Sequence, residues 1–420
     1  MNRISFFLTV LFLFTPCLNL MWAENEETLP EALPVFPPNS LISLSSVEQQ
    51  LTKHYISQYS STGGILWLNA ALQRGNIYLP FIREEIEKRN LPPELAYLPI
   101  IESGFISTAR SKSGAVGLWQ FMLNSISPFG IKVNDYVDER RDFLKATAGA
   151  LQKLEDNYKT LGNWELALAA YNAGLGAVSR TIQQTKIRDY WELSQKKHLK
   201  AETIHYVPKL LAVSYILYYP EQFGIESEPE NFQFSAIPLN RQVSLDMLAS
   251  EAGVDKDLLY RLNSELLHGI SPLDRNYRLK VPLANLPQIS ETLEQENIKL
   301  VSYHHHTVRK GDTLYSLSRH YDVPLGVVEQ HNPGISNRYL KLGEIIIFPA
   351  YREIQPPQYA KTENLRFDGT HVIIKGDTLW SLSMKYNTDP HVLAEANNMQ
   401  INQILSEGKI LKVPINYSKQ

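Results

Sequence analysis

Cysteine is almost absent from this chain: the only one among 420 residues is Cys17, close to the N-terminus. A single cysteine cannot form a disulfide within the chain, so the hydrophobic cores must stabilise the fold alone. Strong charge of either sign is also lacking. The formal net charge is −3, which provides no global basic surface, so we expect no nucleic-acid partner. The apolar run Ile4–Phe14 has only 11 residues, too few to span a bilayer permanently.

The N-terminal segment has the pattern of a signal peptide. A small positive region, Asn2-Arg3, precedes the apolar run, and an acidic stretch begins directly after Ala23. We therefore expect a signal peptide at residues 1–23, a linker at 24–46 and export to the bacterial periplasm or cell envelope. Cys17 stands where lipoprotein signals place their acylated residue, but Pro16 precedes it where a lipobox has Gly or Ala. Membrane anchoring, possible at the outer membrane, is expected only if Cys17 is lipidated.

An internal repeat lies at the other end of the chain. The stretch KGDTLYSL at residues 310–317 recurs at 375–382 as KGDTLWSL. In both copies a short β-type run leads to a Lys-Gly-Asp turn, apolar residues follow at helical spacing, and an apolar run ending in proline closes the unit. This order of strand, helix, helix and strand resembles the LysM domain. The resemblance implies binding of the N-acetylglucosamine-containing backbone of peptidoglycan or chitin, by modules at 304–350 and 369–415 joined by a linker at 351–368.

Each LysM copy has a candidate sugar site at its turn. Glycine can adopt a positive φ there, and the turn and a later asparagine are expected at one edge of the module. The candidate residues are Gly311, Asp312, Thr313 and Asn332 in the first copy, and Gly376, Asp377, Thr378 and Asn397 in the second. The Asp and Thr side chains fit equally well as helix caps without any ligand contact.

A weaker third copy precedes the two clear ones. Leu245 stands 18 positions before Asn263, the offset that Leu314 and Asn332 also have, and Val281-Pro282 supplies a closing pair. The turn glycine is missing. Residues 239–283 therefore fit either a degenerate LysM-like module or a helical linker.

The segment between these ends favours helices. Residues 47–225 are rich in Ala, Leu, Glu, Lys and Gln and have no alternating strand pattern, which predicts one α-helical domain. Within it, residues 90–94 predict a helix start, and Glu102 ends that helix before the stop signal Ser103-Gly104. A carboxylate at the negative end of a helix dipole and beside apolar side chains has a raised pKa, as a general acid at neutral pH requires. Pro99 is expected to kink the last turn. Taken alone, this segment fits a surface carboxylate better than a catalytic one.

Three further motifs change that interpretation. They are Gly117-Leu118-Trp119-Gln120, Ala170-Tyr171-Asn172-Ala173-Gly174 and His205-Tyr206-Val207-Pro208-Lys209. Together with Glu102-Ser103, in this order, they resemble the catalytic domain of the soluble-type lytic transglycosylases, which have the goose-type lysozyme fold. The resemblance implies a multidomain protein: an all-α lysozyme-like catalytic domain followed by small α+β LysM modules with the order βααβ.

The resemblance also implies a reaction. Glu102 protonates the oxygen between N-acetylmuramic acid and N-acetylglucosamine, the substrate's acetamido group stabilises the cationic centre, and the C6 hydroxyl closes on C1 to give a 1,6-anhydro sugar. Most glycosidases use two carboxylates, whereas this family uses one and no cofactor. The resemblance places Ser103, Gln120, Tyr171, Asn172 and Tyr206 around the substrate, peptidoglycan. Tyr206 is one choice among close neighbours, since Tyr215, Tyr218 and Tyr219 follow.

Other charged clusters favour structural roles. Asp135, Asp138, Glu139 and Asp142 are interleaved with Arg140 and Arg141, which predicts a solvated or salt-bridged helix start. His304-His305-His306 lacks metal-ligand spacing, so we predict no metal site. Two alternatives remain open: a hydrolytic muramidase in which a carboxylate such as Asp138 positions water, and a catalytically silent wall-binding scaffold.

Overall fold

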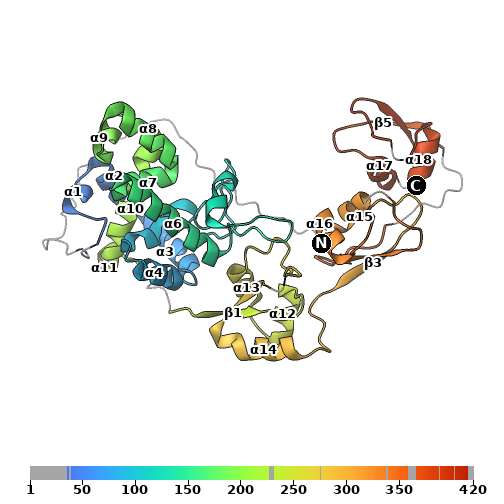
Figure 1. Cartoon of the computed structure of the whole chain (residues 1–420), viewed down its shortest axis with the longest axis horizontal. Coiled ribbons are helices and arrows are strands. Elements are labelled where there is room, and N and C mark those ends of the chain that lie inside the picture. Colours follow the sequence, from blue (N-terminus) through green and yellow to red (C-terminus); the bar gives the residue numbers. More distant parts are fainter. Residues whose placement is uncertain are drawn as a thin grey trace. The chain divides into compact units, whose positions relative to one another are not determined.

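The computed structural model describes residues 36, 39–226, 231–274, 276–336, 339–357, 366–386, 388–401 and 403–414 (Figure 1). The expected signal peptide, including Cys17, lies outside these ranges. Across the part of the chain that is described, no helix combines the length and the apolar character that a membrane span needs.

The N-terminal part of the described chain is helical, as its composition predicts. Its α-helices are α1 (Leu44–Val47), α2 (Gln50–Ser60), α3 (Thr62–Gly75), α4 (Leu79–Lys88), α5 (Leu98–Ser103), α6 (Phe143–Leu161), α7 (Trp164–Ala173), α8 (Leu175–Thr185), α9 (Tyr190–Gln195), α10 (Ala201–Tyr218) and α11 (Pro220–Phe223). Three 3-10 helices, η1 (Pro93–Tyr97), η2 (Leu123–Ser125) and η3 (Ser127–Phe129), lie between them. Side-chain caps begin several of the helices. Asp142 accepts from two amides at the start of α6, and Asn163 caps α7.

The core of this domain holds the elements around Glu102 in place. Helix α10 packs against α2 and α7, and α6 packs against α7. Their buried residues are mainly apolar, with a few polar side chains such as Thr52 of α2 and Thr147 of α6 among them. Trp119, from the long segment between α5 and α6, is completely enclosed and donates its indole N–H to Thr147 Oγ1 at 3.0 Å. The ends of α5, α7 and α10 are thereby held around one region.

The helix that ends at Glu102 differs from the expectation. A 3-10 turn, η1, precedes a separate α-helix, α5, and Pro99 lies in the first turn of α5. A proline there costs no intrahelical hydrogen bond, so the predicted kink in the last turn is wrong. Gly104 ends α5 in the left-handed conformation at φ 58°.

Three small modules follow, each with two antiparallel strands and two helices between them. The first has β1 (Phe234–Pro238), α12 (Leu245–Ala252), α13 (Lys256–Leu262) and β2 (Arg278–Pro282), and then η4 (Leu283–Asn285) and α14 (Leu286–Glu294). The second has β3 (Tyr303–Thr307), α15 (Leu314–Tyr321), α16 (Leu325–His331) and β4 (Ile345–Pro349). The third has β5 (Gly369–Val372), α17 (Leu379–Lys385), α18 (Pro390–Ala396) and β6 (Ile410–Val413). Of the two interpretations of residues 239–283, the strand β2 and its pairing with β1 favour the LysM-like module, which begins before residue 239 because β1 lies at Phe234–Pro238.

One asparagine holds the second helix to the last strand in all three modules. Asn332 Nδ2 donates to the carbonyls of Val328 and Ile347, and its Oδ1 accepts from the amide of Ile347 at 2.8 Å. Asn397 makes the equivalent three bonds in the third module, and Asn263 makes them in the first. Because both ends of the amide are bonded to backbone, this residue stabilises the fold.

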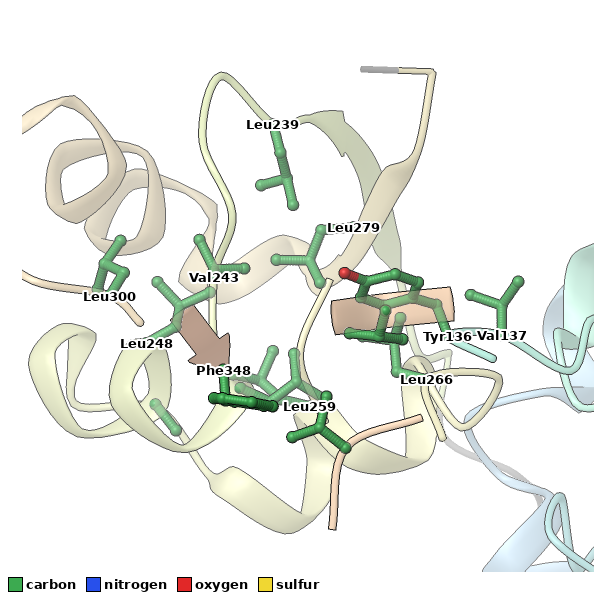
Figure 2. Close-up of a cluster of buried hydrophobic side chains, with 14 of the residues drawn as sticks. Tyr136, Val137, Leu239, Val243, Leu248, Leu259, Leu266, Leu279, Leu300 and Phe348 are labelled. Carbon is green, nitrogen blue, oxygen red and sulfur yellow. The ribbon is translucent and has the colours of Figure 1, made fainter. Parts of the chain in front are cut away.

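The hydrophobic cores are shared unequally. One buried cluster contains Tyr136 and Val137 of the helical domain together with residues of the first and second modules, such as Leu279 and Phe348 (Figure 2). The last module has its own core, built around Leu382, Leu393 and Leu411.

The helical domain and the first module are also joined by polar contacts. Lys280, only 2% exposed, bonds Asp142 at 3.0 Å and Glu265 at 2.5 Å. The amide of Asp138 donates to the carbonyl of Glu265 at 2.9 Å. A buried ion pair of this kind is strongly destabilising to break, because it would leave an unpaired charge.

Candidate active site

Glu102 lies in the last turn of α5, where the loop from Gly117 to Gln120 and helix α10 meet it. Glu102 as a whole is partly exposed to solvent, but its carboxyl group is enclosed by protein atoms. The hydroxyl of Tyr206, on α10, donates to Glu102 Oε1. Of the tyrosines on this helix, Tyr218 instead donates to the buried carboxylate of Glu94 at 3.0 Å.

Burial raises the pKa of Glu102 from 4.5 to about 7. The hydrogen bond from Tyr206 and the charges of Lys153 and Lys209 lower this pKa, while the charge of Glu202 raises it. Desolvation therefore dominates, because it penalises the ionised form more than these partners stabilise it. A carboxyl with this pKa is protonated in a large fraction of molecules near neutral pH, and once ionised it accepts a proton equally readily.

Three charged residues around Glu102 were missed by the sequence interpretation. Lys153 of α6 donates to the carbonyl of Tyr171 at 3.2 Å and lies 4.3 Å from the centre of its ring. Burial lowers the pKa of Lys153, and burial likewise lowers that of Lys209. Glu202 begins α10 and accepts from Asn172 Nδ2 at 3.3 Å. Lys209 belongs to the motif His205-Tyr206-Val207-Pro208-Lys209, whereas no sequence motif marks Lys153 or Glu202.

The predicted substrate-binding residues divide into two groups. Two of them bond backbone atoms near Glu102. The Ser103 hydroxyl donates to the carbonyls of Pro99 and Leu118, and the buried Tyr171 hydroxyl donates to the carbonyl of Trp119 at 2.8 Å. These bonds tie α5 and α7 to the Gly117–Gln120 loop.

Gln120 and Asn172 are partly exposed. Gln120 adopts a left-handed backbone at φ 49°, and its Nε2 donates to the carbonyl of Gly117 at 2.9 Å. Asn172 accepts from Thr203 Oγ1 at 2.8 Å. Both side chains are therefore held in place at the surface, and the loop bend at Gln120 follows from its αL conformation.

Three members of the acidic cluster, Asp138, Glu139 and Asp142, are buried and form the predicted salt-bridged helix start, whereas Asp135 is exposed to solvent. Asp138 pairs with Arg140 at 2.6 Å, Glu139 pairs with Lys145, and Asp142 caps α6. A carboxylate engaged in this way is not available to position water, so the geometry does not support Asp138 as a hydrolytic base.

The LysM turns are stabilised from within. Gly311 and Gly376 have φ values of 98° and 93°, as expected for the turn. Thr313 and Thr378 cap the following helices through capping boxes with Ser316 and Ser381. The predicted capping role is thus filled by the threonines alone.

The two turn aspartates bond histidines of the first strand. Asp312 bonds His306 Nε2 at 2.7 Å, and Asp377 bonds His371 Nε2 at 2.8 Å. His306 is consequently part of strand β3 and of this hydrogen-bond pair. In the described residues no group of His, Cys, Asp and Glu has the arrangement of a metal site.

Models of three known domains match the chain. The transglycosylase SLT domain matches residues 80–194, the LysM domain matches 306–349 and 371–414, and the LysM-like domain of lytic transglycosylase MltD matches 233–298. The match to 233–298 covers the weak third copy and extends beyond both of its expected bounds.

Several known proteins are similar to parts of this chain. Membrane-bound lytic murein transglycosylase D of Escherichia coli K12 is 29% identical over 341 residues, which is 77% of this chain and 73% of that protein. A putative tributyltin chloride resistance protein of Alteromonas is 41% identical over 123 residues, 29% of this chain and 58% of that protein. A solved structure of an inactive lytic transglycosylase Slt from Pseudomonas aeruginosa is 26% identical, covers 35% of this chain and 24% of that one, and has a TM-score of 0.28. These matches identify the chain as a lytic transglycosylase that resembles transglycosylase D in joining an SLT domain to LysM modules.

Proposed function

We propose that Glu102 is the single acid and base with which this lytic transglycosylase cleaves peptidoglycan. The observation that carries the proposal is the enclosed carboxyl of Glu102, with a pKa of about 7, hydrogen-bonded to Tyr206. The bond cleaved is the β-1,4 bond between N-acetylmuramic acid and N-acetylglucosamine.

In this reaction Glu102 first donates a proton and then accepts another. Protonated Glu102 gives its proton to the bridging oxygen as the bond from muramic acid C1 to that oxygen breaks, and the departing N-acetylglucosamine keeps it as a hydroxyl. The acetamido group stabilises the positive charge at C1. The C6 hydroxyl oxygen then bonds to C1 and releases its proton to Glu102, which restores the enzyme without consuming water.

The neighbouring residues hold this carboxyl in its working state. Because Tyr206 donates to Oε1, Oε2 is the oxygen that carries the transferable proton. Ser103 and Tyr171 fix α5 and the loop beside it through backbone carbonyls, and act as positioning residues. Gln120 and Asn172 are partly exposed, and we assign them to contacts with sugar hydroxyls and acetamido groups.

The LysM modules keep the enzyme on the murein of the cell envelope. We retain the turn residues Gly311 to Thr313 and Gly376 to Thr378 as the sugar-facing edge. We no longer assign Asn332 and Asn397 to the sugar, because their amides are bonded to backbone. Association with the outer membrane depends on lipidation of Cys17.

The products of purified murein separate the possible reactions. A lytic transglycosylase leaves muramic ends that are lighter by one water than the reducing ends left by a hydrolase, and mass spectrometry resolves the two. Glu102→Gln keeps the size of the side chain but removes the transferable proton, so product formation should fall at least about a hundredfold. Reducing ends, or retained activity in a folded Glu102→Gln variant, would overturn the assignment.

A further inference from the structure

A pocket of about 480 Å³ lies where the catalytic domain meets the first LysM-like module. Apolar side chains form part of its wall, including Phe105, which follows the Glu102 helix directly. The polar part of the wall is dominated by three arginines and by serine and threonine hydroxyls. These residues are Arg74, Arg141, Arg261, Ser107, Thr108 and Ser264.

None of the three arginines has a carboxylate partner among the residues that the structure describes. Arg74 Nε donates to the carbonyl of Gly104 at 2.7 Å, and Arg261 Nη2 donates to the carbonyl of Arg74 at 2.7 Å. Carbonyls satisfy donors but carry no neutralising charge. Burial and the charge of Arg261 accordingly lower the pKa of Arg74.

Arg141 shows most directly that these guanidinium groups lack acceptors. Its Nε is buried and has no hydrogen-bond partner within the described chain. A buried guanidinium donor without an acceptor costs free energy. Because Nε itself is closed to solvent, the terminal Nη nitrogens of Arg141, which lines the pocket, are the donors that a ligand would meet.

The acidic groups in this region are already committed. Asp138 is paired with Arg140, and Asp142 and Glu265 both bond Lys280. The pocket therefore has an excess of positive charge that the protein itself does not neutralise.

We propose that this pocket binds a carboxylate of the peptide stems that muramic acid carries in peptidoglycan. Planar guanidinium groups match the two oxygens of a carboxylate, and the exposed hydroxyl of Thr108 adds a neutral donor. The apolar wall suits the aliphatic part of a peptide. The proposal rests on peptidoglycan being the substrate, and it adds recognition of the peptide to recognition of the glycan.

Calorimetric titration of the full chain with a soluble stem peptide, free of sugar, tests the site. The peptide should bind, and the same peptide with its carboxylates amidated should bind at least about tenfold more weakly, since charge-assisted hydrogen bonds are lost. Inorganic phosphate should compete weakly or not at all. Equal affinity for both peptides, or tighter binding of phosphate than of peptide, would overturn the assignment to stem peptides.

Arg141→Gln is the sharpest variant, because it removes one charge without breaking a side-chain hydrogen bond of the described structure. It should weaken peptide binding about tenfold or more, and Arg141→Lys should recover part of the loss. Arg278→Gln makes the same change on the exposed face of β2 and should leave binding unchanged. An Arg141→Gln variant that unfolds normally and binds as the unmodified chain does would disprove the site.

A second measurement needs no variant. In the unmodified chain, stem peptide should shift the NMR amide signals of Ser107 and Ser264, and the absence of any shift at saturation would disprove the site. The assays are independent of catalysis: a chain that cleaves murein but does not bind the peptide refutes the pocket alone, and one that binds it but does not cleave refutes the proposed reaction alone.

Discussion

Replacing Glu102 by Gln should stabilise the protein as it removes activity, and the gain should depend on pH. Burial raises the pKa of this carboxyl from 4.5 to about 7 in the folded chain. The folded state therefore binds the proton more tightly than the unfolded state does. Between these two pH values stability falls as pH rises, because unfolding releases a proton.

The size of the effect follows from the shift. A rise from 4.5 to about 7, at about 1.4 kcal/mol per pKa unit, corresponds to about 3 kcal/mol. Below about pH 4.5 the native carboxyl is protonated in both states and costs nothing. Above about pH 7 the folded enzyme encloses a charge that Gln does not have, so the difference between the variant and the native chain should reach its full value there.

The assay is unfolding of both chains from pH 4 to pH 8. The loss of the Tyr206 hydrogen-bond geometry adds an offset, so the change of the difference with pH is the quantity to measure. A gain of about 3 kcal/mol raises the melting temperature of a domain of this size by about 6–12 °C. Glu192→Gln, on the exposed surface of α9, makes the same chemical change at a solvent-exposed carboxylate and reports the background. If the difference between Glu102→Gln and the native chain did not grow with pH, the raised pKa would be refuted.

Three further outcomes are expected. Tyr206→Phe removes a hydrogen bond that lowers the pKa of Glu102, so the alkaline limb of the cleavage rate should move up by about one pH unit; a limb that stayed in place or moved down would contradict the contact. Removal of residues 358–420 takes away only the module with its own core, and should weaken binding to insoluble murein about tenfold or more while soluble fragments are cleaved at the native rate; slower cleavage of those fragments would argue against this division. Gly376→Val has open space around it but φ 93°, so calorimetry should show the last module destabilised by about 1–2 kcal/mol, and an unchanged melting curve would contradict the turn geometry.

The position of the cut is set by how the modules share their cores. Leu300 and Phe348 belong to the same buried cluster as Tyr136, so a cut at residue 300 would open that core. Loss of sugar binding could then not be separated from loss of packing. A cut after residue 357 avoids this problem.

Local sequence determined much of this protein. The repeated KGDTL turn predicts two copies of one fold, because a glycine at positive φ and a threonine cap depend on residues only a few positions apart. Four short motifs in order predict the catalytic domain, which the SLT match confirms, and point to Glu102 as the acid that we propose. Helix formation in residues 47–225 likewise follows from nearby composition.

Tertiary structure decided what depends on distant groups. The choice of Tyr206 over its neighbours on α10 rests on which side of the helix meets α5, and the pKa of Glu102 rests on burial by several elements. From the sequence, the asparagine of each module could equally be a sugar ligand or a structural residue. The structure decides between these roles, because both ends of each amide are bonded to backbone. Likewise, Arg74, Arg141 and Arg261 are far apart in sequence, and only the packing of the first module on the catalytic domain gathers them around one pocket without a carboxylate among them. Contacts of this kind carry no local signature, because their energy arises between residues separated by many positions along the chain.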